Sequence, residues 1–261
     1  MRPSRALVHA MGWLSIGLLL TPLLWAVWVS FTPDELLRPR VGRWSLRWYA
    51  RFLQDGRWMG ALANSMIVGL GSTALALTTG IPVALATARH SFRGRDLLGR
   101  LVLLPICVPP VVLAMGLLPT MHALGLWGTY LSLILGHGLL GMPLVFLTVG
   151  ANLNGVPEEL DQAARGLGAG PLTVFFRITL PLCRPGLFGG AVLSFVLSLN
   201  EFFLALFLGA PETETLPRVI WPELRYSLSP LVAVGSVLTL GLTALACWTF
   251  AWLQGVRPLR R

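Results

Sequence analysis

The stretch ELDQAARGLGAGPLTVFFRITLPLCRPG, Glu159 to Gly186, is central to the fold of this chain because it carries five charges between long apolar runs. Its acidic side chains come first, where they favour the positive end of a helix dipole. Gly168 follows at the position of a left-handed helix cap, and Gly170-Pro171 starts a second short helix. Pro181 then ends that helix. The stretch therefore predicts two short helices joined by a glycine hinge.

The first of these helices has one apolar face. Its residues at i, i+3, i+4 and i+7 are Leu160, Ala163, Ala164 and Leu167. Asp161 and Arg165 are four residues apart and are expected to pair on the opposite, solvated face. The small alanines would let another surface approach closely. We therefore expect the segment from Pro157 to Pro181 to lie flat on the inner face of a membrane as a docking element.

The composition indicates that the solvent of this chain is a bilayer. Its 261 residues are 55% hydrophobic and 12% charged, with a mean hydropathy of +0.72, whereas soluble domains are about 25% charged. All 20 basic residues are arginine, so the chain lacks the lysine of a P-loop ATPase. The arginines flank apolar runs, as they do in membrane proteins, which argues against nucleic acid as a partner. The cysteines and histidines show no metal-ligand spacing, and we expect no catalytic, cofactor or metal site.

Six stretches can supply the about 20 apolar residues that a spanning helix requires. The approximate spans are 11–31, 62–88, 101–119, 130–151, 186–208 and 231–253. The first is longer than the apolar region of a signal peptide, which is about 7–15 residues, so we expect it to remain uncleaved. We expect the turn between the third and fourth spans near Met121 to Gly128. The spans predict a single transmembrane domain over residues 1–261.

The connection between the first two spans allows two interpretations. The sequence SLRWYARFL has apolar residues at helical spacing, namely Leu46, Tyr49, Phe52 and Leu53. It is either a helix lying in the membrane interface or an ordinary solvated loop.

An even number of spans puts both termini on the same side of the membrane. That side then holds 12 arginines, including those near both termini, against 8 on the other side. Cytoplasmic loops are enriched in arginine and lysine. The bias therefore predicts cytoplasmic termini, although the loop after the first span holds six arginines on the opposite side.

Glu201 is an acidic residue inside the fifth span. Ser194 and Ser198 precede it at helical spacing, and Asn200 lies beside it in the sequence. A charged side chain at the bilayer centre costs about 2.5–3.5 kcal/mol on insertion scales, so it must face protein or water. Two interpretations stay open. Glu201 is either a substrate-path carboxylate suited to a cationic solute or a structural acid near the outer mouth, hydrogen-bonded to a neighbour.

The docking element also resembles a known motif. Inner-membrane permeases of ABC importers carry EAA, three residues, Gly, nine residues and Ile-x-Leu-Pro in a cytoplasmic loop between two late spans. This chain has Gln162-Ala163-Ala164, Gly168, Ile178 and Leu180-Pro181 in the same register. The phrases LSFVLSLNEFFLALFL and TLPRVIWPELRYSLSP are also similar to permeases of the spermidine/putrescine type. Gln162 replaces the glutamate of the motif, so a neutral hydrogen bond would replace an ionic contact made by relatives.

The resemblance implies an all-α membrane protein with the type I ABC importer permease fold, which has six transmembrane helices and a cytoplasmic coupling helix between the fourth and fifth. It implies that the coupling residues toward a separate ATPase are Gln162, Ala163, Ala164, Arg165, Leu167, Gly168, Ile178, Leu180 and Pro181. The implied partners are a second, different permease chain, two ATP-binding-cassette ATPase subunits, an extracytoplasmic substrate-binding protein and membrane lipid. ATP and Mg would be bound by the ATPase. This chain would be a transport subunit of a bacterial inner membrane and not an enzyme.

Two other classes of protein fit less of the sequence. A secondary transporter or channel that works without an ATPase would need charged relay residues in several spans, and it leaves the docking element unexplained. An intramembrane enzyme would need a paired catalytic constellation, whereas His137 is a lone imidazole within a span.

The resemblance implies a small solute such as spermidine or putrescine, while similar permeases also serve iron, sulfate and phosphonates.

Overall fold

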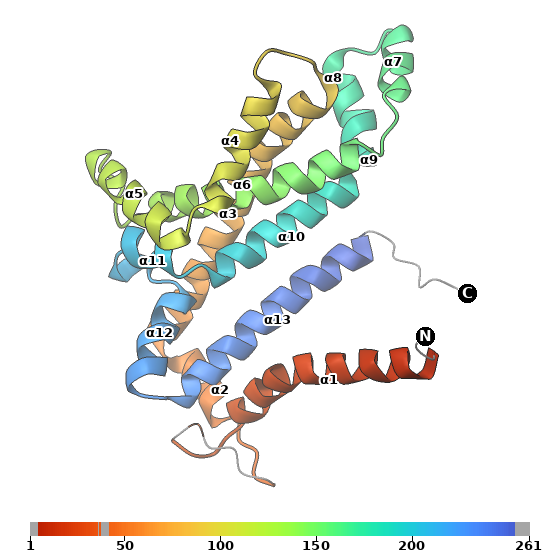
Figure 1. Ribbon diagram of the computed structural model, residues 1–261. Coiled ribbons are helices and arrows are strands. Elements are labelled where there is room, and N and C mark those ends of the chain that lie inside the picture. Colours follow the sequence, from red (N-terminus) through yellow and green to blue (C-terminus); the bar gives the residue numbers. More distant parts are fainter. Residues whose placement is uncertain (1–4, 36, 38–41, 254–261) are drawn as a thin grey trace. The chain divides into compact units, whose positions relative to one another are not determined.

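The computed structural model describes residues 5–35, 37 and 42–253, and these form helices along most of their length (Figure 1). An isolated parallel bridge joins Gly128 and Gly209. The helices are α1 (Arg5–Ser30), α2 (Arg47–Gln54), α3 (Gly56–Arg89), α4 (Arg95–Cys107), α5 (Pro110–Ala123), α6 (Tyr130–Leu153), α7 (Glu159–Gly166), α8 (Pro171–Val174), η1 (Phe175–Thr179), α9 (Leu180–Leu182), α10 (Arg184–Asn200), α11 (Phe203–Leu208), η2 (Pro211–Thr213), α12 (Leu216–Tyr226) and α13 (Pro230–Leu253). The expected all-α class is confirmed.

Six stretches of the described residues are long and apolar enough to cross a membrane, provided that each of two bent helix pairs counts as one span. The single helices are α1 from Met11 onward, α3, α6 and α13. The bent pairs are α4 with α5, and the Pro171–Leu182 helix with α10. The chain is therefore an all-α membrane protein, while a single domain over 1–261 with the expected span limits stays a prediction.

Close packing divides the chain into two compact units. Of the described residues, the first contains those up to 59 and 219–242, and the second contains 60–218 and 243–253. Helices α3, α12 and α13 each contribute to both units.

In the first unit, aromatic side chains hold α2 against the start of α3. Phe52 is fully buried, and its ring centroid lies 5.4 Å from that of Trp58. The connection is thus helical over Arg47–Gln54, while its placement in the membrane interface stays a prediction. Its expected apolar face is only partly correct, because Trp48 is buried while Leu46 and Leu53 are exposed.

The third span, expected over 101–119, is interrupted by a bend. α4 ends at Cys107 and α5 begins at Pro110, with a bend of 104° between them. Val108 is extended (φ −89°, ψ 131°), because a residue that precedes a proline is driven out of the helical region. Pro110 then supplies a preset φ to the first turn of α5. Adjacent prolines therefore break this span in two.

The fifth span, expected over 186–208, is also interrupted. α10 ends at Asn200, Glu201 is extended (φ −79°, ψ 116°), and α11 begins at Phe203. The Glu201 Oε1 atom accepts hydrogen bonds from the N–H groups of Phe203 and Leu204, at 2.8 and 3.1 Å. The carboxylate thereby satisfies the first amides of α11, which have no partner inside their own helix.

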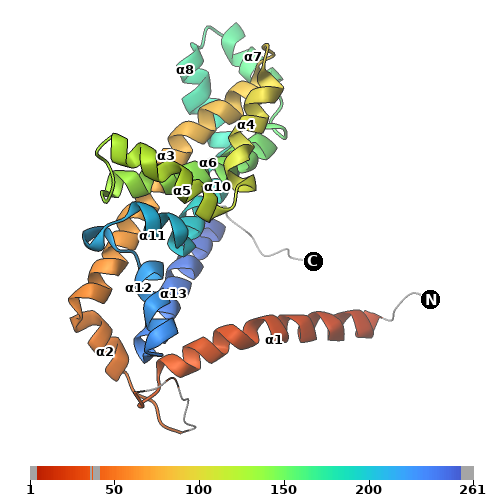
Figure 2. The ribbon, with the colours of Figure 1, turned by 60° about the vertical axis from the view of Figure 1, so that its left-hand side comes forward.

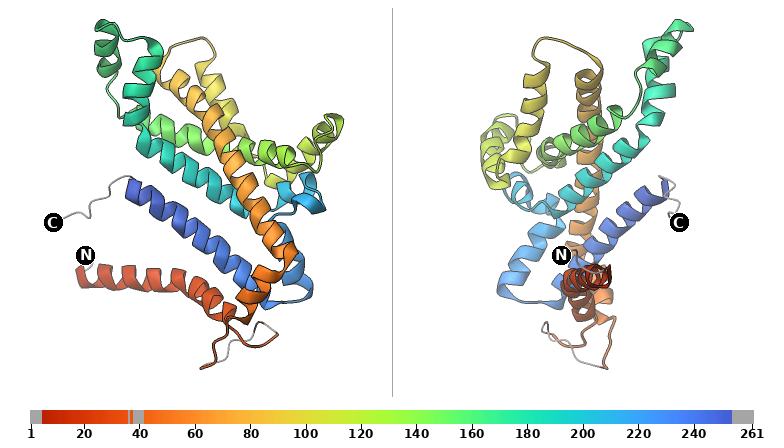
Figure 3. Two further views of the ribbon diagram at one scale, coloured as in Figure 1. Left: turned by 180° about the vertical axis from the view of Figure 1, so that it is seen from behind. Right: turned by 45° about the vertical axis from the view of Figure 1, so that its right-hand side comes forward.

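α6 and α10 lie side by side in the second unit (Figures 1 and 3). Glycines let their backbones approach closely. A Cβ atom on Gly190 would lie 2.9 Å from the Cα atom of Val145, and one on Gly186 would lie 2.7 Å from the carbonyl oxygen of Thr148. Such small residues are typical of contacts between membrane helices.

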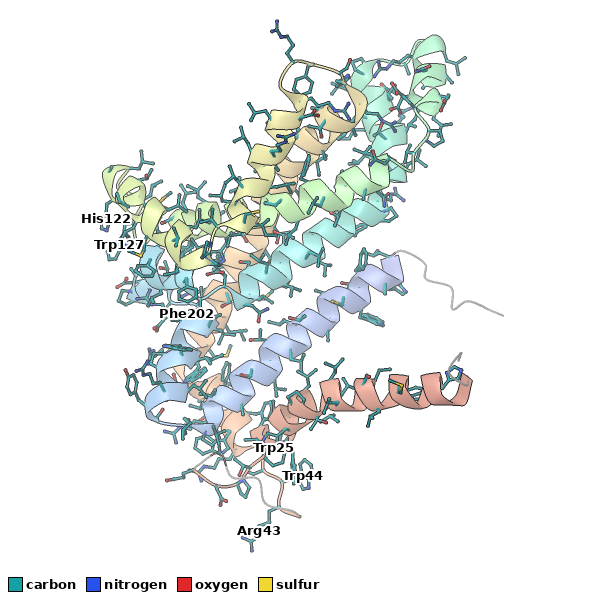
Figure 4. The ribbon with its side chains drawn as sticks, viewed as in Figure 1. Trp25, Arg43, Trp44, His122, Trp127 and Phe202 are labelled. Atoms are coloured by element: carbon teal, nitrogen blue, oxygen red, sulfur yellow. The ribbon has the colours of Figure 1, made fainter. Side chains whose placement is uncertain are left out.

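The turn between α5 and α6 falls where the sequence predicted it. Gly125 and Gly128 have φ values of 66° and 80°. His122 stacks on Trp127 with 4.9 Å between ring centroids (Figure 4), and the Trp127 indole N–H donates to the carbonyl oxygen of Phe207 at 3.0 Å. The tryptophan thus ties this turn to α11.

The packing of α6 against α10 generates a first prediction. We expect Gly190→Ala to destabilise the purified protein by about 1–3 kcal/mol, the usual effect of overpacking, because the new methyl group would meet the Val145 backbone. Gly150→Ala on α6 is the matched control, since its methyl group would meet nothing within 4 Å. Thermal unfolding in detergent measures both variants. Equal midpoints for the two alanine variants would contradict this account of the helix contact.

Candidate functional site

The segment from α7 to α9 forms the expected helical hairpin, at the same end of the second unit as the α3–α4 turn (Figures 1 and 2). Gly168 has φ +88°, a conformation that glycine adopts without strain. The N–H group of Ala169 donates to the carbonyl oxygen of Ala164 at 3.0 Å and closes the end of α7. Pro171 begins α8, which continues through η1 into α9. The predicted glycine cap of α7 at Gly168 and the predicted start of a second helix at Pro171 are confirmed.

The apolar stripe of α7 is exposed. Leu160 is 45% exposed and Leu167 is 91% exposed. On the second helix of the hairpin, Leu172 and Phe176 are also largely exposed. The described part of the chain thus leaves an apolar surface of the hairpin uncovered.

The residues of the recognised motif lie in two environments. Those that are exposed are Gln162, Ala163, Arg165, Leu167 and Gly168, and those that are half-buried are Ala164, Ile178, Leu180 and Pro181. Leu180 lines a small cavity together with Ile81 of α3 and Val149 of α6. The first part of the motif is therefore accessible, while the last part anchors the hairpin to the helices beneath it.

Asp161 lies in a buried ion pair and not on a solvated face. The expected pair with Arg165 is wrong, because the Asp161 side chain is 9% exposed and its Oδ2 atom lies 3.6 Å from Nε of Arg89. The Thr179 hydroxyl donates to Asp161 Oδ1 at 3.2 Å. Arg89 Nη2 also donates to the carbonyl oxygen of Val156, at 2.9 Å. The carboxylate thus links α7 to the last residue of α3 and to η1.

A second polar cluster lies near the other end of α3. The Asn64 amide Nδ2 donates to the carbonyl oxygens of Glu212 and Glu214, at 3.1 and 2.9 Å. Asn64 Oδ1 accepts from the Tyr130 hydroxyl at 2.7 Å. The sequence showed Asn64 as a polar residue within an apolar run but did not indicate what it bonds to. Its partners lie in the segment between α11 and α12 and at the start of α6.

The polar stripe of α10 is mostly buried inside the second unit. Ser194 and Ser198 are 1% and 5% exposed, and the Ser198 hydroxyl bonds to Nδ1 of His137 on α6 at 2.8 Å. Glu201 is 8% exposed and caps α11, whereas Asn200 is exposed. The structure thus gives Glu201 the hydrogen bonds of the structural interpretation, and contact with a substrate stays a prediction. Among the described residues, no group of three or more His, Cys, Asp or Glu has the arrangement to hold a metal ion.

The apolar spans and the exposed helical hairpin fit the class of ABC importer permeases that the motif predicted. A family model described as the binding-protein-dependent transport system inner membrane component matches residues 76–255. The putrescine transport system permease protein PotI of Escherichia coli (strain K12) is 30% identical over 263 residues, which cover 95% of this chain and 92% of PotI. The chain belongs to the family of binding-protein-dependent transport system inner membrane components.

Two further comparisons agree with this assignment. The spermidine/putrescine transport system permease protein PotC of Haemophilus influenzae is 29% identical, over 86% of this chain and 89% of that protein. A solved bacterial ABC transporter involved in the import of the acidic polysaccharide alginate has a TM-score of 0.70 at 19% identity, over 98% of this chain and 99% of that one. The fold is therefore the expected type I importer permease fold. Family membership argues against the alternative of a transporter or channel without an ATPase.

The capping role of Glu201 generates a second prediction. We expect Glu201→Ala to destabilise the protein by about 0.5–2 kcal/mol, the effect of losing a capping acceptor. Glu201→Gln should have a smaller effect, because its amide oxygen can accept the same two N–H groups. Thermal unfolding of the purified variants in detergent distinguishes them. An alanine variant as stable as the unmodified chain would show that the cap has no energetic importance.

Proposed function

We propose that this chain is a permease subunit of an importer for polyamines such as spermidine and putrescine, and that its α7–α9 hairpin seats in a groove of a separate ATPase subunit. The observation that carries the coupling role is the exposed apolar face of α7, within the motif that runs from Gln162 to Pro181. An apolar face left open by its own chain fits burial against another protein. The buried Asp161 holds the opposite face of α7 to the rest of the permease.

The proposal places ATP and Mg on the partner ATPase. The absence of lysine from the chain supports this division, because a Walker A loop requires a lysine at the phosphates. Two ATPase subunits would bind two permease chains, this one and a different one, and an extracytoplasmic binding protein would deliver the solute. The family's description as a binding-protein-dependent system supports the last of these partners. Membrane lipid would surround the apolar spans.

We place the hairpin and both termini in the cytoplasm. The hairpin is bonded to Arg89, at the start of the α3–α4 turn that also contains Arg93. Arginine-rich turns favour the cytoplasmic side, so the hairpin and this turn support the same orientation. Four of the arginines that contribute to the cytoplasmic charge bias, namely Arg2, Arg257, Arg260 and Arg261, lie outside the described residues.

The proposed substrate class rests on the relatives and on one side chain. PotI and PotC, named for putrescine and spermidine/putrescine transport, match over most of the chain. Glu201 supplies a carboxylate at the break between α10 and α11, next to the exposed Asn200. A carboxylate attracts the cationic amines of a polyamine. In this proposal Ser194 and Ser198 support the break from within the bundle, with Ser198 bonded to His137.

The coupling role is tested at Gly168. A side chain at φ +88° is strained and costs about 1–2 kcal/mol in the left-handed region. We expect Gly168→Val to reduce the ATPase retained on the purified permease by about tenfold, the equivalent of 1.4 kcal/mol. Gly166→Ala is the matched control in the same hairpin, since its methyl group would meet nothing within 4 Å. Retention of the ATPase by both variants would contradict the role of the hairpin.

The substrate class is tested at Glu201 with the conservative change. Glu201→Gln keeps an acceptor for the α11 cap and removes the charge. If the carboxylate contacts a cationic solute, loss of a charged hydrogen bond worth about 1.5–3 kcal/mol should raise the KM for putrescine uptake at least tenfold. Uptake into liposomes that contain the complete transporter measures this. Glu212→Gln, at an exposed acid of η2, is the control. An unchanged KM would remove Glu201 from the substrate path.

A further inference from the structure

α3 makes polar contacts with loops near both of its ends. It has 34 residues, which correspond to about 51 Å at 1.5 Å per residue. The hydrocarbon core of a bilayer is about 30 Å thick. A helix of this length can reach the loops on both faces, and Asn64 and Arg89 are the residues at which it does so. The helix is continuous between them, through Pro82.

At the hairpin end, Arg89 holds two parts of the chain at once. Its guanidinium bonds to the carbonyl oxygen of Val156, in the connection that leads to α7, and faces the Asp161 carboxylate within α7. Both side chains are nearly buried, at 11% and 9% exposure. Separating them would leave each charge without its partner in a poorly hydrated site, which is strongly unfavourable. The hairpin and the end of α3 are therefore expected to move together.

At the opposite end, α3 holds the segment between α11 and α12, residues 209–216. Asn64 donates to two of its carbonyl oxygens, those of Glu212 and Glu214. The Ser65 hydroxyl accepts from the N–H group of Leu216 at 2.8 Å. Both Asn64 and Ser65 are buried. These bonds attach the 209–216 segment to the side chains of two consecutive residues of α3.

Between these ends, α3 packs closely against its neighbours through small residues. A Cβ atom on Gly71 would lie 2.6 Å from the side chain of Ile134 on α6, and one on Gly80 would lie 3.1 Å from the carbonyl oxygen of Met142. Ala76 is fully buried. Residues 71–80 of α3 are thus held closely against α6.

We propose that Arg89 and Asn64 are positioning residues of transport. In this proposal α3 transmits a displacement of the coupling hairpin, which is bonded to Arg89, to the 209–216 segment, which is bonded to Asn64. The inference rests on the proposed function, because it requires that a partner ATPase moves the hairpin. Neither residue belongs to the recognised motif. Their role is to make the hairpin, α3 and the far segment respond as one body.

The test measures whether ATP binding reaches the 209–216 segment. The complete transporter, with both permeases and the ATPase, is placed in lipid nanodiscs, and hydrogen exchange of 209–216 is compared with and without a non-hydrolysable ATP analogue. This readout does not depend on the identity of the solute. We expect an ATP-dependent change in the unmodified chain. Arg89→Gln should reduce that change by about 2- to 30-fold, the range for mutations along coupled contacts, while the ATPase stays bound.

Matched variants separate this role from a purely structural one. Arg93→Gln removes an exposed arginine from the same turn and should leave the ATP response unchanged, while Arg89→Lys keeps the charge opposite Asp161 and should restore most of it. At the far end, Asn64→Ala should release the segment and abolish the response there. Thr78→Ala is its control, because Thr78 is exposed and its hydroxyl donates to the carbonyl oxygens of Ala74 and Leu75 within α3.

Each outcome decides one statement. An ATP response of normal size in Arg89→Gln, or no response in the unmodified chain with the ATPase bound, would overturn the inference and leave the proposed function standing. Failure of the unmodified permease to bind its ATPase would overturn the proposed function itself. If Arg89→Gln does not yield folded protein, Asn64→Ala decides, and a normal response there would overturn the inference.

Discussion

A backbone amide in the hydrocarbon core of a bilayer has no water to bond to, so each N–H and C=O group must find its partner within the protein. Long helices such as α3, α6 and α13 meet this demand along their whole length. The two broken spans meet it differently. At Pro109-Pro110 the residues that interrupt the helix carry no N–H group. At Glu201 a carboxylate accepts two amides that the break leaves free. A chain of this composition can therefore stop a helix without leaving bare backbone.

The same demand determines where polar side chains are placed. Along the middle of α3, Ala76 and Ala84 are buried, and the buried hydroxyl groups of Ser72 and Thr73 donate to the carbonyl oxygen of Gly69 within the helix. The polar contacts come near the ends, where Asn64 and Arg89 bond to loop carbonyl oxygens. Charged and amide groups are less unfavourable near the faces of a bilayer than at its centre. The close packing of the helix against α6 and its polar contacts with loops are thus separated along its axis.

Features that depend on neighbouring residues were predictable from the sequence. Gly168 and Pro171 set the hinge because a cap and a helix start are local geometry, and the apolar runs followed from composition. Features that depend on distant partners were not. Asp161 was assigned to the solvated face because the spacing to Arg165 was visible, whereas its pairing with Arg89 exists only after α3 and α7 meet. The polar stripe of α10 was visible in the sequence, but its burial against α6 was not.

α1 is apolar over Met11–Ser30, with a mean hydropathy of 1.7. Its backbone bonds are internal and its side chains are apolar, which are the two conditions that a bilayer imposes on a spanning helix. Insertion of this helix therefore depends on its mean apolarity more than on the shape of any one side chain, so exchanges among leucine, isoleucine and valine should leave its insertion unchanged.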